Sequence, residues 1–113
     1  MSLPAQQRSH LYLYLSPGCG VGGHCIPVDP YYLIVAENEN DFAHDLLLLA
    51  RQANDRMPKF TVGKLAQALS KLEIPINGAR IAVLGLAYKP WIDDVRNSPS
   101  FEIIDELTRG GQK

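Results

Sequence analysis

A four-residue apolar run limits what this chain can fold into. Residues 81–84 read Ile-Ala-Val-Leu, without the polar alternation of a strand that has one face in water. Such a run is typical of a parallel strand that is covered on both faces. Ser98 and Pro99 then offer an N-cap and a first helical residue, and an apolar stripe follows as far as Gly110. The order of strand, loop and helix is that of the first unit of a doubly wound α/β domain.

One strand and one helix cannot bury a hydrophobic core. The chain has 113 residues, and residues 10–16, where leucine alternates with tyrosine, offer only one further short strand. We therefore expect the chain to be a piece of a longer protein. Its own fold is expected to be mainly α, with the strand–helix unit at its C-terminal end.

A long helix is predicted in the middle of the chain. Its apolar stripe consists of Phe42, Leu46, Leu49, Ala53 and Met57, and continues to about Leu72. Pro58 is expected to kink or restart this helix because proline lacks the amide N–H. Residues 46–49 are apolar all round, which predicts burial on more than one side. The pattern fits contact with another domain or a second subunit, and it fits core packing within one chain equally well.

Charge and hydropathy exclude several classes of protein. Eleven Lys and Arg against twelve Asp and Glu give a net charge of −1, so there is no basic surface for nucleic acid. The densest apolar run is far shorter than the roughly 20 residues of a membrane span. The first residues contain no apolar signal core. We therefore expect no nucleic-acid partner, no membrane contact and a cytoplasmic location.

Residues 18–23 form a glycine-rich loop that runs into His24 and Cys25. Four glycines in six residues permit positive φ angles and a close approach of the backbone to a neighbouring group. Pro27 and Pro30 then stiffen the exit from the loop. Backbone N–H groups in such a turn can stabilise a thiolate or an oxyanion. Cys25 is therefore a candidate nucleophile.

The chain's two cysteines, Cys19 and Cys25, also permit other interpretations. Two thiols six residues apart do not make a disulfide framework, and both can be buried free thiols. Together with His24 they could supply three zinc ligands, but adjacent residues rarely bind one ion, so we expect no metal. A thiol hydrolase would pair Cys25 with a histidine. The candidates for that histidine are His10, His24 and His44.

Two separate motifs carry a resemblance to a known family. Residues 20–32, Gly-Val-Gly-Gly-His-Cys-Ile-Pro-Val-Asp-Pro-Tyr-Tyr, resemble the substrate loop of the UDP-glucose/GDP-mannose dehydrogenase family. Residues 85–90, Gly-Leu-Ala-Tyr-Lys-Pro, and residues 93–99, Asp-Asp-Val-Arg-Asn-Ser-Pro, resemble the opening of its C-terminal nucleotide-sugar-binding domain. The helix between them is similar to the family's central dimerisation helix. The resemblance covers residues 11–110.

The resemblance implies three regions and a larger parent protein. Residues 1–35 would be the substrate and catalytic cysteine region, residues 36–75 the dimerisation helix, and residues 76–113 the start of the nucleotide-sugar-binding domain. The parent would be an α/β homodimer whose subunits have two Rossmann-like domains. The Gly-x-Gly-x-x-Gly fingerprint for NAD does not occur at residues 85–87, so this last region would bind the nucleotide sugar instead.

The resemblance also implies an activity, the NAD-dependent oxidation of a UDP-sugar C6 alcohol to a carboxylate in polysaccharide biosynthesis. Cys25 would form a thiohemiacetal and then a thioester with the sugar, and Asp29 would position or activate water. Arg96 would lie on the cofactor side. The substrate-binding residues would be Gly20, Val21, Gly22, Gly23, His24, Tyr31 and Lys89. The chain by itself is expected to be inactive.

Two positions bear on the identity of the sugar. Val28 stands where family members that oxidise UDP-glucose usually have lysine, and His24 precedes the cysteine. Both resemble the branch that acts on UDP-N-acetylhexosamines, of the N-acetylmannosamine type. The alternatives are a UDP-glucose 6-dehydrogenase and, in a different class, a non-catalytic helical dimerisation module.

Overall fold

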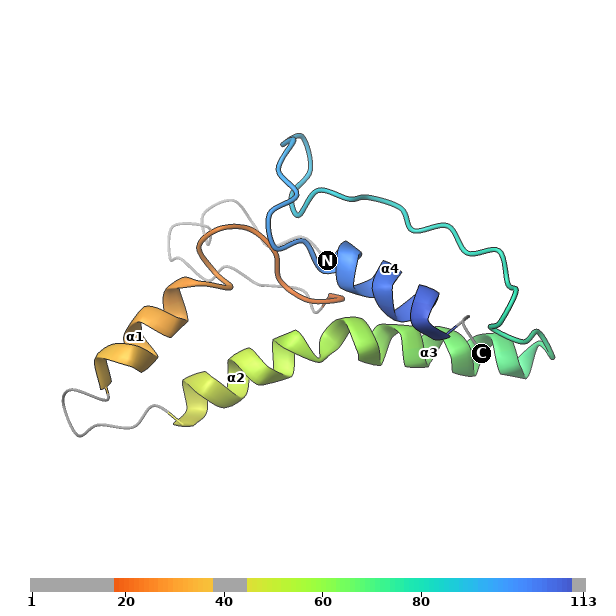
Figure 1. The fold of residues 1–113 in the computed structure, drawn as a ribbon, viewed down its shortest axis with the longest axis horizontal. Helices are drawn as coiled ribbons and strands as arrows, with labels where there is room; N and C mark the ends of the chain where they lie inside the picture. Colours follow the sequence, from red (N-terminus) through yellow and green to blue (C-terminus); the bar gives the residue numbers. More distant parts are fainter. Residues whose placement is uncertain (1–17, 38–44, 111–113) are drawn as a thin grey trace, which may run out of the picture.

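The computed structural model describes residues 18–37 and 45–110 (Figure 1). Within these ranges the chain is helical. The helices are α1 (Asp29–Glu37), α2 (Asp45–Asp55), α3 (Met57–Lys71) and α4 (Pro99–Gly110). α1 packs on α2, α2 leads directly into α3, and α4 packs along α3. The prediction of a mainly α chain is confirmed for this part.

The long central helix breaks at Arg56, between α2 and α3. Pro58 is the second residue of α3, where a missing N–H costs little. The Arg56 N–H still reaches the Gln52 carbonyl at 3.3 Å, and the Phe60 N–H reaches the Arg56 carbonyl at 3.0 Å. The two helices therefore continue roughly in line in Figure 1, and the predicted restart at Pro58 is confirmed. Phe42, at the start of the predicted stripe, lies outside the described residues.

Helix α1 does not follow from the sequence patterns, which suggest a stiff extended exit from the loop at Pro27 and Pro30. Instead α1 begins at Asp29, with Pro30 in its first turn, where its fixed φ suits a helix. Between Asp29 and Glu37 the residues of α1 are all apolar or aromatic, so they carry no 3.6-residue periodicity. For this reason the helix leaves no amphipathic signal.

The strand predicted at residues 81–84 is wrong for this structure. These residues run without helix or strand pairing, and no strand occurs in the part of the chain that the structure describes. A strand requires a hydrogen-bonded neighbour, and the described residues supply none. Leu84 is accordingly 91% exposed. The other predicted strand, at residues 10–16, lies outside the described residues.

Helix α4 matches its prediction, starting at Pro99 and ending at Gly110. Ser98 precedes it as a buried N-cap, and its Oγ accepts a hydrogen bond from the Ser100 N–H at 3.4 Å. A cleft of about 460 Å³ separates α4 from residues 76–83. Its lining includes Ile76, Ile81, Val83, Ile104 and Leu107. Residues 76–83 and α4 thus face each other across this cleft, although residues 81–84 form no strand.

Hydrophobic burial is incomplete across the described residues. Apart from Pro27 and Pro58, none of their apolar side chains is buried, and Leu46, Leu49 and Leu72 are 83%, 58% and 69% exposed. A folded protein gains most of its stability by removing such surfaces from water. No helix among these residues is long and apolar enough to cross a membrane.

The glycines of the loop pack closely against the segment that leads into α4. A Cβ on Gly22 would stand 2.7 Å from Tyr88 Cβ and 3.0 Å from the Asn97 carbonyl oxygen. A Cβ on Gly20 would stand 3.0 Å from Pro99 Cβ, and Gly20 has φ +133°. Glycine is therefore required where these two segments meet, because no side chain fits between them.

The first prediction concerns Gly22. In the intact protein, Gly22→Ala should lower the free energy of unfolding by about 1–3 kcal/mol, since the added methyl overpacks Tyr88 and Asn97. Gly63→Ala is the matched control, because a methyl group on Gly63, inside α3, would meet no atom within 4 Å. It should raise stability by about 0.5–1 kcal/mol. Denaturant unfolding measures both, and equal effects would contradict this packing.

Candidate functional site

The two sequence motifs meet in space. The Gly23 N–H donates to the Arg96 carbonyl oxygen at 2.9 Å, and Asn97 Nδ2 donates to the Gly23 carbonyl oxygen at 2.9 Å. Both backbone polar groups of Gly23 are thereby satisfied by the second motif. The cysteine loop and residues 88–99 consequently form one site, although they are far apart in the sequence.

Arg96 and Asp94 form the charged centre of this site. The Arg96 guanidinium donates to both carboxylate oxygens, from Nε at 2.9 Å to Oδ1 and from Nη2 at 2.6 Å to Oδ2. The Arg96 backbone N–H adds a bond of 3.0 Å to Oδ1. These hydrogen bonds, the side-chain one first, lower the pKa of Asp94 from 3.8 to about 2. The site therefore holds a fixed ion pair at neutral pH.

His24 joins this ion pair from the glycine loop. Its Nδ1 lies 3.5 Å from Arg96 Nη2 and 3.9 Å from Asp94 Oδ2. The Nδ1 edge of the imidazole thus faces the second motif. This geometry gives no support to a Cys25–His24 dyad, which would need the ring beside the sulfur.

Cys25 occupies the turn between the glycine loop and α1, and its side chain is exposed. Its carbonyl oxygen accepts hydrogen bonds from the Val28 N–H at 2.9 Å and from the Asp29 N–H at 2.8 Å. The backbone at Cys25 is therefore held by the first turn of α1. The Arg96 guanidinium lies within electrostatic range of the thiol, because Cys25 contributes, after Asp94 and Tyr88, to the raised pKa of Arg96.

The other predicted residues lie at varying distances from this centre. Asp29 is the first residue of α1 and is exposed. Lys89 is exposed on a loop that is closed by the Tyr88 N–H bonding the Asp94 carbonyl at 3.2 Å. The Tyr31 hydroxyl donates to Asp55 at 3.3 Å, so this hydroxyl is directed to α2. Val21 lines a cavity of about 340 Å³ behind the loop.

Sequence reasoning assigns no role to three residues on which this site depends. Asp94, Tyr88 and Asn97 are part of the second motif, but nothing in the pattern links them to the cysteine loop. An Asp two residues before an Arg is the one available signal for the Asp94–Arg96 pair. Tyr88 and Asn97 act through sterics and a long-range hydrogen bond, which leave no local pattern.

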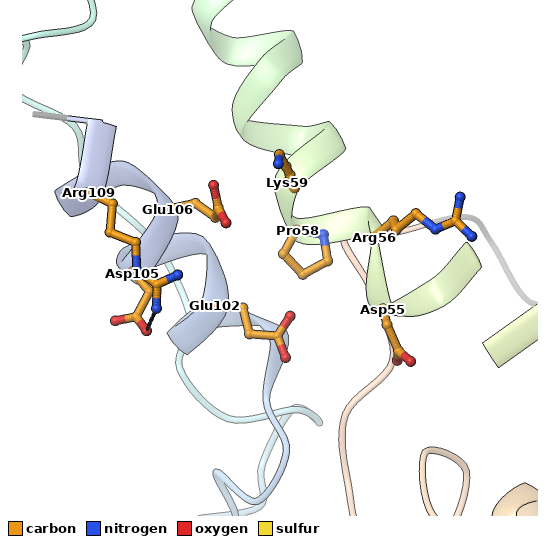
Figure 2. A pocket seen from close by; sticks show the side chains of 8 residues that line it. All are labelled: Asp55, Arg56, Pro58, Lys59, Glu102, Asp105, Glu106 and Arg109. Atoms are coloured by element: carbon orange, nitrogen blue, oxygen red, sulfur yellow. Dashed lines mark hydrogen bonds and ion pairs between the residues drawn. The ribbon is translucent and has the colours of Figure 1, made fainter. Parts of the chain in front are cut away.

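A second cavity, of about 250 Å³, lies between the α2–α3 break and α4 (Figure 2). Pro58 stands in its wall, with Arg56 and Lys59 on one side and carboxylates of α4 on the other. An ion pair in its wall joins Arg109 to Asp105, neighbours on α4, at 3.4 Å. The cavity contains none of the predicted site residues. Among residues 18–37 and 45–110, no group of three His, Cys, Asp or Glu side chains is arranged to hold a metal ion.

The lowered pKa of Asp94 yields a prediction about pH. The ionised carboxylate stabilises the site fully above its ordinary pKa of 3.8, and this contribution is lost as the pH falls through about 2. Arg96→Gln should raise the pKa of Asp94 toward 3.8, while Arg109→Gln, which removes an exposed arginine of α4, should leave it unchanged. Carboxyl NMR titration of the intact protein measures both. A midpoint near 3.8 in the unaltered protein would contradict the ion pair.

Sequence comparison places both motifs in one family. A profile described as the UDP-glucose/GDP-mannose dehydrogenase family, central domain, matches residues 4–56, and the profile of the same family's UDP binding domain matches residues 82–113. The chain is 50% identical over 98 residues to a UDP-N-acetyl-D-mannosamine dehydrogenase of Pyrococcus horikoshii, covering 87% of this chain and 22% of that protein. A Campylobacter jejuni protein of the same name is 47% identical over 93 residues, covering 82% and 21%.

Solved structures agree with the sequences. The structure of the Pyrococcus horikoshii UDP-D-ManNAc dehydrogenase matches with a TM-score of 0.78 and 42% identity, over 94% of this chain and 24% of that one. An NDP-N-acetyl-D-galactosaminuronic acid dehydrogenase of Methanosarcina mazei matches with a TM-score of 0.79 and 33% identity, over 89% and 23%. The chain spans about a fifth of the length of the curated relatives it matches. With both of its motifs matched in order, the chain belongs to the UDP-glucose/GDP-mannose dehydrogenase family.

Proposed function

We propose that this chain is part of an NAD-dependent dehydrogenase that oxidises the C6 alcohol of a UDP-N-acetylhexosamine, of the N-acetylmannosamine type, to the uronic acid. The observation that carries the proposal is the joining of the cysteine loop, with its exposed thiol, to residues 88–99, which carry the Asp94–Arg96 ion pair. The names of the Pyrococcus and Campylobacter relatives support the choice of sugar.

In this proposal Cys25 is the nucleophile for the second oxidation. Its thiolate adds to the C6 aldehyde carbon, forms a C–S bond and leaves a thiohemiacetal once the oxygen is protonated. Two NAD⁺ molecules in succession, with Arg96 on their side of the site, would each supply the acceptor for one hydride, the first from the alcohol and the second from the thiohemiacetal, which gives a thioester. Water then attacks the resulting thioester, the C–S bond breaks, and the acid and the thiol are released. Asp29, at the start of α1 and close in sequence to Cys25, is proposed to orient that water.

The charged groups of the site would bind the anionic reactants. Arg96 fits a contact on the cofactor side, because its side chain is 64% exposed although it is paired with Asp94. Residues 85–87 offer no glycine cradle for a pyrophosphate, so the chain's own share of NAD binding is small. Lys89 and the N-terminus of α4 would take the nucleotide-sugar phosphates. The exposed His24 would contact the sugar, while Gly20, Val21, Gly22 and Gly23 would hold the loop in place for it.

We also propose that the intact protein is a homodimer through α2 and α3. Leu46, Leu49 and Phe60 on these helices are 83%, 58% and 57% exposed, and such surfaces favour burial against a second subunit. This arrangement explains why leucines occupy residues 46–49 all round.

The dimer proposal predicts the effect of charges on this surface. Leu46→Asp with Leu49→Asp should shift the intact protein from dimer to monomer in sedimentation velocity, because an interface would have to bury two unpaired carboxylates. Arg109→Gln, which changes an exposed arginine of α4 and lies off α2 and α3, is the control and should leave the dimer unchanged. A dimer that survives the double substitution would move the interface elsewhere.

The nucleophile proposal predicts that Cys25→Ala stops net conversion of alcohol to acid, a fall on the order of 10³-fold or more. Cys19→Ala is the matched control, since Cys19 is the other exposed thiol of the same loop, and it should retain most activity. Steady-state NADH production by the intact protein measures both. Iodoacetamide should inactivate the unaltered enzyme, and bound UDP-sugar should protect it. Two NADH per sugar at near-parental rate from Cys25→Ala would disprove covalent catalysis.

The choice of sugar is tested by comparing substrates. The intact enzyme should show a higher kcat/KM for UDP-N-acetylmannosamine than for UDP-glucose. The reason is that Val28 replaces the lysine usual in the glucose-oxidising members and His24 lines the loop. A higher kcat/KM for UDP-glucose would overturn the sugar but not the family.

A further inference from the structure

Arg51 of α2 is buried in a way that helix packing alone does not explain. Among residues 18–36 and 45–110, Arg51 is the one charged residue that is buried, with 7% of its surface exposed. On the same helix, Leu46 and Leu49 are largely exposed. Desolvating a guanidinium is costly, and a buried ion pair is often no more stabilising than apolar residues of similar volume. The placement of an arginine here therefore calls for a role other than net stability.

The partners of Arg51 connect two helices. Arg51 Nη2 donates to Asp55 Oδ1 at 2.6 Å, one turn along α2. The Tyr31 hydroxyl of α1 donates to the other oxygen of the same carboxylate at 3.3 Å. The Arg51 guanidinium also lies 5.8 Å from the centroid of the Tyr31 ring, within range of a cation–π contact. Asp55 and Arg51 of α2 thus both contact Tyr31 of α1.

Helix α1 in turn holds the backbone of Cys25. The N–H groups of Val28 and Asp29, at and just before the start of α1, donate to the Cys25 carbonyl at 2.9 and 2.8 Å. A change in the direction of α1 would therefore move Cys25. The path from Arg51 to the thiol runs through Asp55, Tyr31 and the first turn of α1, and each link is a contact in the structure.

Arg51 also faces the second motif across the cavity of about 340 Å³. Val21, Pro27 and Val28 of the cysteine loop form one wall. The other is formed by Asn97 and Ser98 of the second motif with Phe101 and Glu102 of α4. Arg51 Nε is buried here without a hydrogen-bond partner among the described residues. Arg51 thus lies where α2, the cysteine loop and the start of α4 converge.

We propose that Arg51 is a positioning residue of the dehydrogenase site, which sets the orientation of Cys25 through Asp55 and Tyr31. The inference rests on the proposed function, because it assigns Arg51 to the reaction of Cys25. Tyr31 then acts through its hydrogen bond to Asp55, and its effect on catalysis depends on Arg51. A misplacement of a reacting group by about 1 Å can cost on the order of a hundredfold in rate.

The test uses Arg51→Met in the intact protein. Methionine fills a similar length of apolar space, and the Asp55 side chain left behind is 49% exposed, so its charge stays solvated. We expect kcat to fall about ten- to a hundredfold, with a smaller change in KM and a thermal midpoint within a few degrees of the parent. Arg51→Lys, which keeps the charge on a similar side chain, should recover part of the loss.

Tyr31→Phe removes only the hydroxyl that reaches Asp55. It should lower kcat in the protein that retains Arg51 and have little further effect in the Arg51→Met variant. The reason is that Tyr31 and Arg51 act as one unit. The rate at which iodoacetamide alkylates Cys25 should change in the same variants. If the thermal midpoint is unchanged, a general loss of structure cannot account for that change. Arg56→Met is the control. Arg56 is an exposed arginine at the break between α2 and α3, and its replacement should leave kcat unchanged.

The outcomes separate this inference from the proposed function. Parental kcat and alkylation rate in Arg51→Met, with Cys25→Ala inactive, would overturn the role of Arg51 alone. Additive effects of Tyr31→Phe and Arg51→Met would overturn the path through Asp55. An active Cys25→Ala would overturn the proposed function itself, whatever Arg51 does.

Discussion

The structure depends on the pair of hydrogen bonds by which the second motif holds Gly23. The Arg96 carbonyl and the Asn97 side chain satisfy both backbone groups of this residue. An unpaired backbone group next to such tight packing would be costly, so the two segments stabilise each other. This one connection brings the cysteine loop, the Asp94–Arg96 ion pair and the start of α4 into one place. Without it the predicted site residues would remain on separate parts of the chain.

The glycines of the loop serve this connection first. Their spacing suggests that the backbone approaches a ligand, but the groups that actually approach are Tyr88, Asn97 and Pro99 of the same chain. A side chain at Gly22 or Gly23 would collide with the Tyr88 side chain. Gly23 also has φ +98°, a conformation that side chains disfavour. The loop can therefore present Cys25 to a substrate only because its glycines pack against other residues of the same chain.

The exposed apolar residues and the placement of the charged ones have a common explanation. Leucines on α2 remain in contact with water while Arg51 is buried, the reverse of what stability within one chain favours. Surfaces of this kind fit the proposed dimer, in which a second subunit would cover the leucines. Arg51, by contrast, is buried by contacts within this chain, where α1, α2 and the cysteine loop meet.

The sequence by itself determined the local features of this protein. The restart at Pro58, the start of α4 at Ser98-Pro99, the mainly helical character and the membership of the family all follow from patterns carried by neighbouring residues. Tertiary structure decided the rest. Residues 81–84 form no strand because a strand needs a partner, and the apolar helix α1 lacks a periodic signal. Only the folded chain decides that Asp94, Tyr88 and Asn97 meet the cysteine loop, because their contacts cross more than sixty residues of sequence, and no local pattern encodes such a distance.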